Sequence, residues 1–281
     1  MTEVLVTGGS GPGVSQGRVA RSAVSGPWAV MPDLARRQGL RMLRHPVLLL
    51  GVAWFVLGYG LSGPSTPYDR YSAVTGMLAF MLGPVSFFAA NLVASSDRRC
   101  GAEEWTPSLP LPAVHRTAAM LLACLVPAAA VGLLDLAAVA LFGPHEATMP
   151  LLWQHVASVP LVVLGATVLG VAVARLLPWP GVPLVVMVGL IAFNAWVGGD
   201  HRYLGFYVDF AEWTPSSTAY ADVIPPMTPG SPSWHLVYLA ALCGLAACGA
   251  LLRDARRWWL PFTTGGVLGA LVLVAGALQL P

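Results

Sequence analysis

The stretch that decides the fold is residues 117–142, which read TAAMLLACLVPAAAVGLLDLAAVALF. It carries one charged residue, Asp135. At about 1.5 Å per residue, a helix over this stretch is long enough to cross the ~30 Å hydrocarbon layer of a membrane. Similar apolar runs recur at residues 46–62, 71–93, 151–174, 182–197, 234–252 and 260–280. The sequence therefore predicts an all-α polytopic membrane protein with six to seven transmembrane helices.

Charge is scarce and sorted along the chain. Only 10% of the 281 residues are charged, against roughly a quarter in soluble domains. There is no lysine, and with a cytoplasmic N-terminus 13 of the 15 basic residues fall on the inner side, leaving Arg70 and Arg202 outside. The inner arginines are Arg18, Arg21, Arg36, Arg37, Arg41, Arg44, Arg98, Arg99, Arg116, Arg175, Arg253, Arg256 and Arg257. The positive-inside rule then predicts a multi-pass protein of a bacterial-type cell (plasma) membrane, with its N-terminus in the cytoplasm. Because the arginines flank the spans, membrane lipid is an expected partner and nucleic acid is not.

Three regions follow from this pattern. Residues 1–32 are rich in Gly, Ser and Val and are expected to form a flexible cytoplasmic tail. Residues 33–45 open with DLARRQGLRMLR, in which Leu34, Leu40 and Leu43 alternate with four arginines, a pattern typical of an amphipathic helix on the inner membrane surface. The alternative is that these arginines form a cluster that only fixes the membrane topology. The transmembrane domain is then residues 46–281, with a long external loop at about 198–233.

Tryptophans mark the ends of the predicted spans. The indole ring is amphipathic and prefers the headgroup layer of a membrane. The residues concerned are Trp28, Trp153, Trp179, Trp196, Trp213, Trp234, Trp258 and Trp259. We expect them to anchor the helices at the membrane surfaces.

The loop between the second and third predicted spans concentrates charge that the rest of the chain avoids. Residues 95–112 read SSDRRCGAEEWTPSLPLP. Ser96 or Asp97 can cap a short helix, and Pro107 disfavours helical conformation at Thr106, so about two turns fit between them. A helix this short is unstable alone and must dock on something. An ordinary solvated loop is the alternative.

This loop resembles the D-x-R-x-G-x-E … S-x-P … R stretch in permease subunits of type-two ATP-binding-cassette (ABC) exporters. The matching residues are DRRCGAEE at 97–104, SLP at 108–110, and Arg116. In that family the loop carries a cytoplasmic coupling helix, between helices 2 and 3, that seats in the ATPase subunit. The resemblance covers about residues 33–257, and a seventh span at 260–280 departs from the usual six. The ATPase-coupling residues that it implies are Asp97, Arg98, Arg99, Glu103, Glu104 and Trp105.

The resemblance implies that the chain is the membrane-spanning subunit of an ATP-driven exporter and forms the substrate pathway. ATP and Mg would bind a separate ABC ATPase subunit, and a second permease copy or a homologous permease would complete the pathway. The chain has no Walker sequence, so we expect no enzyme activity from it alone. The alternatives are an accessory or structural membrane subunit without transport of its own, or an intramembrane enzyme. The six histidines lack metal-site spacing and no nucleophile motif occurs, so no catalytic residue and no metal ligand is predicted.

Two polar residues inside predicted spans are candidates for the pathway, Asp135 and Asn194. A carboxylate within a span costs roughly 2.5–3.5 kcal/mol unless it faces protein, water or a partner. Asp135 lies seven residues before Phe142, which places it about 10 Å below the outer end of its helix. We therefore expect it to face the interior. A packing hydrogen bond or a protonated acid is an equal alternative to a pathway role.

Overall fold

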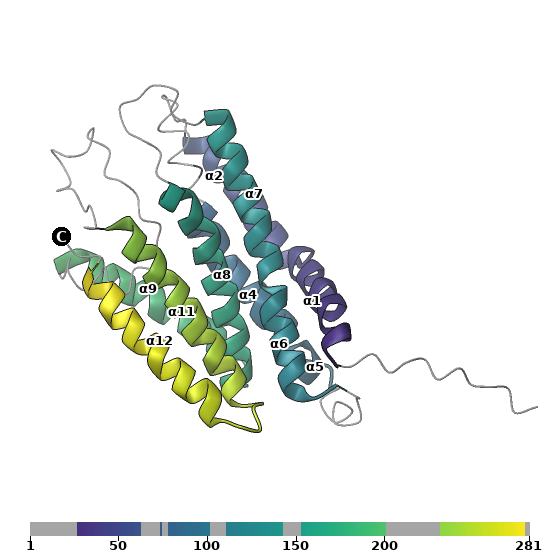
Figure 1. Ribbon diagram of the computed structural model, residues 1–281. Helices are drawn as coiled ribbons and strands as arrows, with labels where there is room; N and C mark the ends of the chain where they lie inside the picture. Colours follow the sequence, from purple (N-terminus) through teal and green to yellow (C-terminus); the bar gives the residue numbers. More distant parts are fainter. Residues whose placement is uncertain are drawn as a thin grey trace, which may run out of the picture.

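The protein is a bundle of helices that lie roughly side by side (Figure 1). The computed structural model describes residues 27–62, 74, 78–101, 111–142, 153–200 and 231–278. Within these residues every regular element is a helix and none is a strand, which confirms the all-α prediction. Their bounds are α1 (Pro27–Leu43), α2 (Pro46–Ser62), the π-helix η1 (Leu78–Leu82), α4 (Gly83–Ala94), α5 (Ser96–Arg99), α6 (Ala113–Ala123), α7 (Leu125–Phe142), α8 (Trp153–Leu176), α9 (Val182–Asp200), α11 (Pro232–Leu252) and α12 (Trp259–Leu278).

The apolar runs of the sequence all fall on helices, and several of these helices can cross a membrane. Four spans in the described part of the chain are long and apolar enough: α6 with α7, α8, α11 and α12. A fifth is added when α1 and α2, which are bent by 50° at their junction, count as one broken span. The described parts of α4 and α9 are shorter apolar helices. The chain is thus a multi-pass membrane protein by length and composition, and the total of six to seven spans stays a prediction.

The span predicted at residues 117–142 consists of two helices because of one proline. Pro127 has no N–H to donate, and its ring crowds the carbonyl four residues earlier, at Ala123. Helix α6 ends at that residue, and the N–H of Cys124 turns to the nearer carbonyl of Leu121 at 3.2 Å. Helix α7 starts again at Leu125.

Helix α1 packs on α6 and is longer than predicted. It begins at Pro27, six residues before the expected start at residue 33. Its buried positions include Met31 and Ala35, which pack on Ala119 of α6 and extend the apolar face toward the N-terminus. The leucines expected to form that face are only half-buried: Leu34, Leu40 and Leu43. Three arginines lie exposed on the helix, Arg36, Arg37 and Arg41, and exposed Arg44 follows its last residue. The tail was expected at residues 1–32, but residues 27–32 belong to α1, and residues 1–26 lie outside the described residues.

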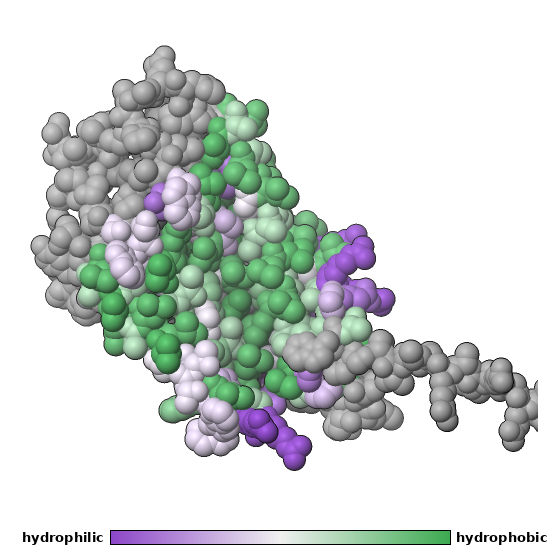
Figure 2. All heavy atoms as spheres, in the orientation of Figure 1, coloured by the Kyte–Doolittle hydropathy of each residue, from purple (hydrophilic) through white to green (hydrophobic). Residues whose placement is uncertain are grey.

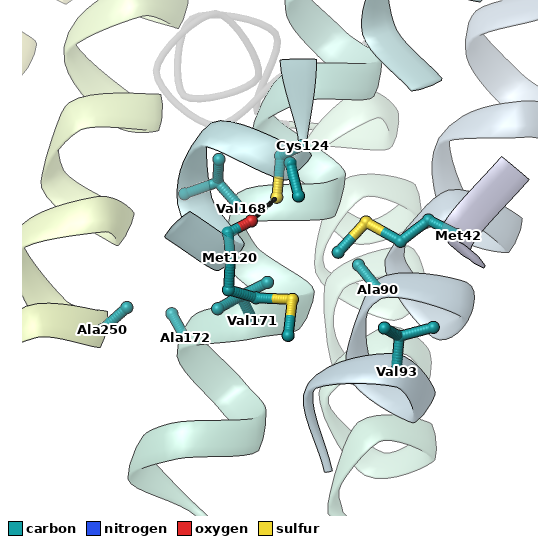
Figure 3. Close-up of a cluster of buried hydrophobic side chains, with 10 residues drawn as sticks. Met42, Ala90, Val93, Met120, Cys124, Val168, Val171, Ala172 and Ala250 are labelled. Atoms are coloured by element: carbon teal, nitrogen blue, oxygen red, sulfur yellow. Dashed lines mark hydrogen bonds between the residues drawn. The ribbon is translucent and has the colours of Figure 1, made fainter. Parts of the chain in front are cut away.

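Small side chains dominate the core where α1, α4, α6, α8 and α11 meet (Figure 3). Its buried residues are Met42, Ala90, Val93, Met120, Ala123, Cys124, Val168, Val171, Ala172 and Ala250. The thiol of Cys124 donates a hydrogen bond to the carbonyl of Met120, with 3.4 Å between sulfur and oxygen. Because lipid gives no hydrophobic drive between helices, association in a membrane relies on close packing of this kind.

Helices α4 and α8 approach each other closely at Gly170. A Cβ on Gly170 would overlap the carbonyl oxygen of Phe87 and lie 3.1 Å from its carbonyl carbon. The side-chain amide of Asn91 donates to the carbonyl of Gly170 at 3.0 Å, and both residues are buried. The two helices therefore touch backbone to backbone and are also joined by a hydrogen bond.

The surface of the bundle has the character of a membrane protein. Hydrophobic residues cover its middle in Figure 2, and hydrophilic ones gather beside α1 and near the turn between α11 and α12. The exposed large apolar residues include Val185 on α9 and Val267 on α12, at 71% and 70%. Such a wide apolar surface is normal when the solvent is lipid.

Candidate functional site

Charged residues gather where α5, the start of α6, the end of α8 and residues 253–258 meet, which we call the arginine-rich end. Three hydrogen bonds join its parts. Arg98 Nη2 of α5 donates to the carbonyl of Ala174 in α8 at 3.3 Å. Thr117 Oγ1 of α6 donates to Asp254 Oδ2, and Arg253 Nη1 donates to the carbonyl of Arg175 at 2.6 Å. Segments far apart in the sequence are thereby fixed to one another.

Arg175 lies at the electrostatic centre of this end. It is half-buried near the end of α8, and the charges that act on it come from Asp254, Arg116, Asp97 and Arg98. These residues belong to the turn after α11, to α6 and to α5. Charges from three separate segments thus act on one half-buried arginine, and such charges interact more strongly than in water.

Helix α5 occupies the place of the predicted coupling helix. Its described part is one turn, and Figure 1 shows it beside α6 at the lower end of the bundle. The turn ends at Gly101, whose φ of +67° is a left-handed conformation that favours glycine. The N–H of Gly101 donates to the carbonyl of Arg98 at 3.1 Å, which closes the helix end.

The predicted capping of α5 is wrong. Ser95 occupies the N-cap position and makes no side-chain cap. Its hydroxyl donates backward to the carbonyl of Asn91 at 2.7 Å, and that of Ser96 donates to Val93 at 2.8 Å. Both serines thus satisfy the last carbonyls of α4, and α5 follows α4 almost directly. We expected a separate helix with its own N-cap, because the sequence alone does not show whether a serine caps the start of one helix or bonds to the end of the helix before it.

The structure describes three of the six predicted coupling residues. Asp97 and Arg99 are exposed on α5, while Arg98 is half-buried and held against α8. The other three, Glu103, Glu104 and Trp105, lie outside the described residues.

Two residues of this end were missed by sequence reasoning, Thr117 and Asp254. They are 137 positions apart, and no local pattern links a threonine in an apolar helix to an aspartate in a distant turn. The one available signal was that Asp254 is the single acid among the arginines at 253, 256 and 257.

Asp135 is fully buried on α7, so its predicted interior orientation is confirmed. Its neighbours one turn away, Val131 and Ala138, pack with Leu78 and Leu82 of η1. Within the described residues, neither carboxylate oxygen has a hydrogen-bond partner. Asp135 is thus a buried acid in apolar surroundings, beside a π-helix of the kind often found at functional sites.

Asn194 lies in the second half of α9, where the structure gives no placement for its side chain. Its pathway role stays a prediction.

Histidines and acids do not form a metal site in the part of the chain that the structure describes, where no three His, Cys, Asp or Glu residues are grouped for one. Comparison of the chain with protein-family models, with curated proteins and with solved structures finds no match.

Proposed function

We propose that this chain is the permease subunit of an ATP-driven exporter of the type-two ABC class, with a separate chain as its ATPase. The observation that carries the proposal is the attachment of α5 to the bundle. Arg98 ties α5 to Ala174 of α8, 76 positions away, at 3.3 Å. A partner that moves α5 therefore moves α8 as well.

The exposed side of α5 suits a docking partner. Asp97 is exposed at its first turn, and Glu103, Glu104 and Trp105 follow in the sequence. Tryptophan is among the residues that dominate protein interfaces, and acids beside it can pair with basic residues of a partner. ATP and Mg would bind the partner, and this chain would receive the motion at α5.

The motion has a direct route into the bundle. From α8 it passes to the turn after α11 through the hydrogen bond between Arg253 and Arg175, and from that turn to α6 through Asp254 and Thr117. Helix α6 continues into α7, which carries Asp135, the candidate pathway residue. By the positive-inside rule the arginine-rich end faces the cytoplasm, where ATP is found.

The test is purification of the tagged chain from its native membrane in mild detergent. A chain with Walker motifs should co-purify and hydrolyse ATP in a vanadate-sensitive manner. Asp97→Arg, and separately Glu103→Arg with Glu104→Arg, should each lower ATPase recovery at least tenfold, since losing a desolvated charge contact costs about 2–5 kcal/mol. Expression should stay normal.

The matched control is Asp33→Arg, the same charge change at an exposed acid of α1. It should leave ATPase recovery unchanged. Absence of a Walker-containing partner, or equal recovery from wild type and the α5 variants, would refute the proposal.

A further inference from the structure

A small pocket lies beside α5, on the side away from Asp97. Its volume is about 270 Å³, and it is enclosed by the end of α4, by α5 and by the connection between α8 and α9. Arg98 and Arg99 line it, together with buried Asn91 and Ser95, whereas Asp97 does not. The opposite wall is the connection around Trp179. Of the charged residues of α5, half-buried Arg98 and exposed Arg99 thus contribute to the pocket lining, and Asp97 does not.

The charge of this pocket selects an anion. Among the described residues that line it, two carry guanidinium groups and none carries a carboxylate. The two arginines of α5 therefore make the potential in this small cavity positive. Arginine is the side chain best shaped to bind phosphate, because its planar fork donates two parallel hydrogen bonds.

The other walls indicate that the anion belongs to a lipid. Trp179 is 76% exposed at the rim, and its indole suits the headgroup layer. Next to the pocket, α9 exposes Leu184, Val185 and Val188, an apolar strip along which acyl chains can lie. The volume is just below the ~300–1,000 Å³ of pockets that enclose whole small molecules, so it fits a headgroup and leaves the chains outside.

We propose that this pocket binds the phosphate of an anionic glycerophospholipid through Arg99 and Arg98, with Trp179 beside the glycerol. The site holds α5, α8 and the start of α9 in place from the membrane side. It does not depend on the proposed exporter function, because a lipid can occupy this pocket whether or not an ATPase docks on α5, and Asp97 does not line it.

The experiment is native mass spectrometry of the full chain in detergent, titrated with phosphatidylglycerol or with phosphatidylcholine of the same acyl chains. Phosphatidylglycerol should bind more tightly. Arg99→Gln should weaken it about fivefold, and Arg98→Gln with Arg99→Gln about thirtyfold, because each basic residue near an anionic lipid contributes about 1 kcal/mol. Phosphatidylcholine, whose choline cation offsets the charge of its phosphate, should lose less affinity than phosphatidylglycerol, and Arg99→Lys should keep most of the phosphatidylglycerol affinity.

The matched control is Arg256→Gln with Arg257→Gln, which removes two exposed arginines from the turn before α12. Its phosphatidylglycerol affinity should stay within twofold of wild type. An equal loss in the control pair would overturn the proposal, since it would show general charge attraction. Trp179→Ala, at an exposed position that folding does not need, should also lose affinity even if an arginine variant fails to fold.

Two further outcomes overturn the lipid assignment. Inorganic phosphate alone may be compared with phosphatidylglycerol by thermal shift, and equal stabilisation by both would make free phosphate the ligand. If phosphatidylglycerol is not retained but Arg99→Gln lowers ATPase recovery, the pocket belongs to the protein partner. Because Asp97→Arg leaves the pocket residues intact, it should keep lipid binding, so failure of either proposal can be recognised separately.

Discussion

Replacing Gly170 by alanine tests the packing of the bundle most directly. The added Cβ would overlap the carbonyl oxygen of Phe87 and lie 3.1 Å from its carbonyl carbon and 3.3 Å from Ala90 Cβ. Two of these atoms belong to the backbone, so no rotamer change relieves the overlap and α4 must move away from α8. Overpacking of this kind costs about 1–3 kcal/mol.

The same movement weakens the hydrogen bond from Asn91 to the carbonyl of Gly170, now 3.0 Å. Such bonds between helices in a membrane are worth about 0.6–1.7 kcal/mol. Alanine favours a helix over glycine by about 1 kcal/mol, which offsets part of the loss. The net destabilisation of Gly170→Ala is therefore about 1–4 kcal/mol.

The assay is thermal unfolding of the purified chain in detergent, followed by tryptophan fluorescence. Gly266→Ala is the control, since a Cβ there meets nothing within 4 Å and only the gain in helix propensity remains. Gly170→Ala should unfold several degrees below wild type, and Gly266→Ala at or above it. Asn91→Leu should cost less stability in the Gly170→Ala background than in wild type, because the bond is already weakened. An equal or higher Tm for Gly170→Ala than for Gly266→Ala would refute the close approach of α4 and α8.

Two other predictions concern ionisable groups. Asp135→Leu should raise Tm by an amount corresponding to about 1–3 kcal/mol, because the described structure gives the buried carboxylate no partner. Vanadate-sensitive ATP hydrolysis by the complex should fall in this variant if the acid lines the pathway. A lower Tm would instead show a structural role. Burial, and then the charges of Arg41 and Arg99, lower the pKa of His45, which precedes the first span and accepts a hydrogen bond from the N–H of Val47 at 3.3 Å. As pH falls, the unfolded chain therefore protonates His45 before the folded chain does, so the contribution of His45 to stability is present above about pH 6.5 and is lost as pH falls toward the folded pKa. The Tm of the wild type should drop more between about pH 7.5 and 5.5 than the Tm of His45→Asn. Parallel plots of Tm against pH for the two proteins would contradict this.

The helices were predictable because their signal is local. The run at residues 46–62 has no charge, and the structure places α2 at those residues. The start of α1 was not predictable, since Pro27–Pro32 become helical through the contact of Met31 with Ala119, which only the folded chain creates. Pro127 could have indicated the break at Cys124, but the length of the apolar run led us to predict one continuous span.

The site was only partly predictable, for a similar physical reason. The charges of residues 97–99 stand out in an apolar chain and mark the arginine-rich end. Their partners are backbone carbonyls, such as that of Ala174, and a carbonyl has no signature in sequence. Arg98 and Arg99 of α5 line a pocket whose other wall is the connection after α8. The sequence alone does not place this connection beside α5.

The bond between Thr117 and Asp254 also has a consequence in time. Its two ends are separated by 137 residues, so during synthesis α6 enters the membrane long before its partner exists. At about 5–20 residues per second, the ribosome needs on the order of ten seconds to reach Asp254. For that interval the arginine-rich end of a newborn chain lacks this bond, and a chain truncated before residue 254 never forms it. The bond forms only after α11 and the first residues that follow it have been made.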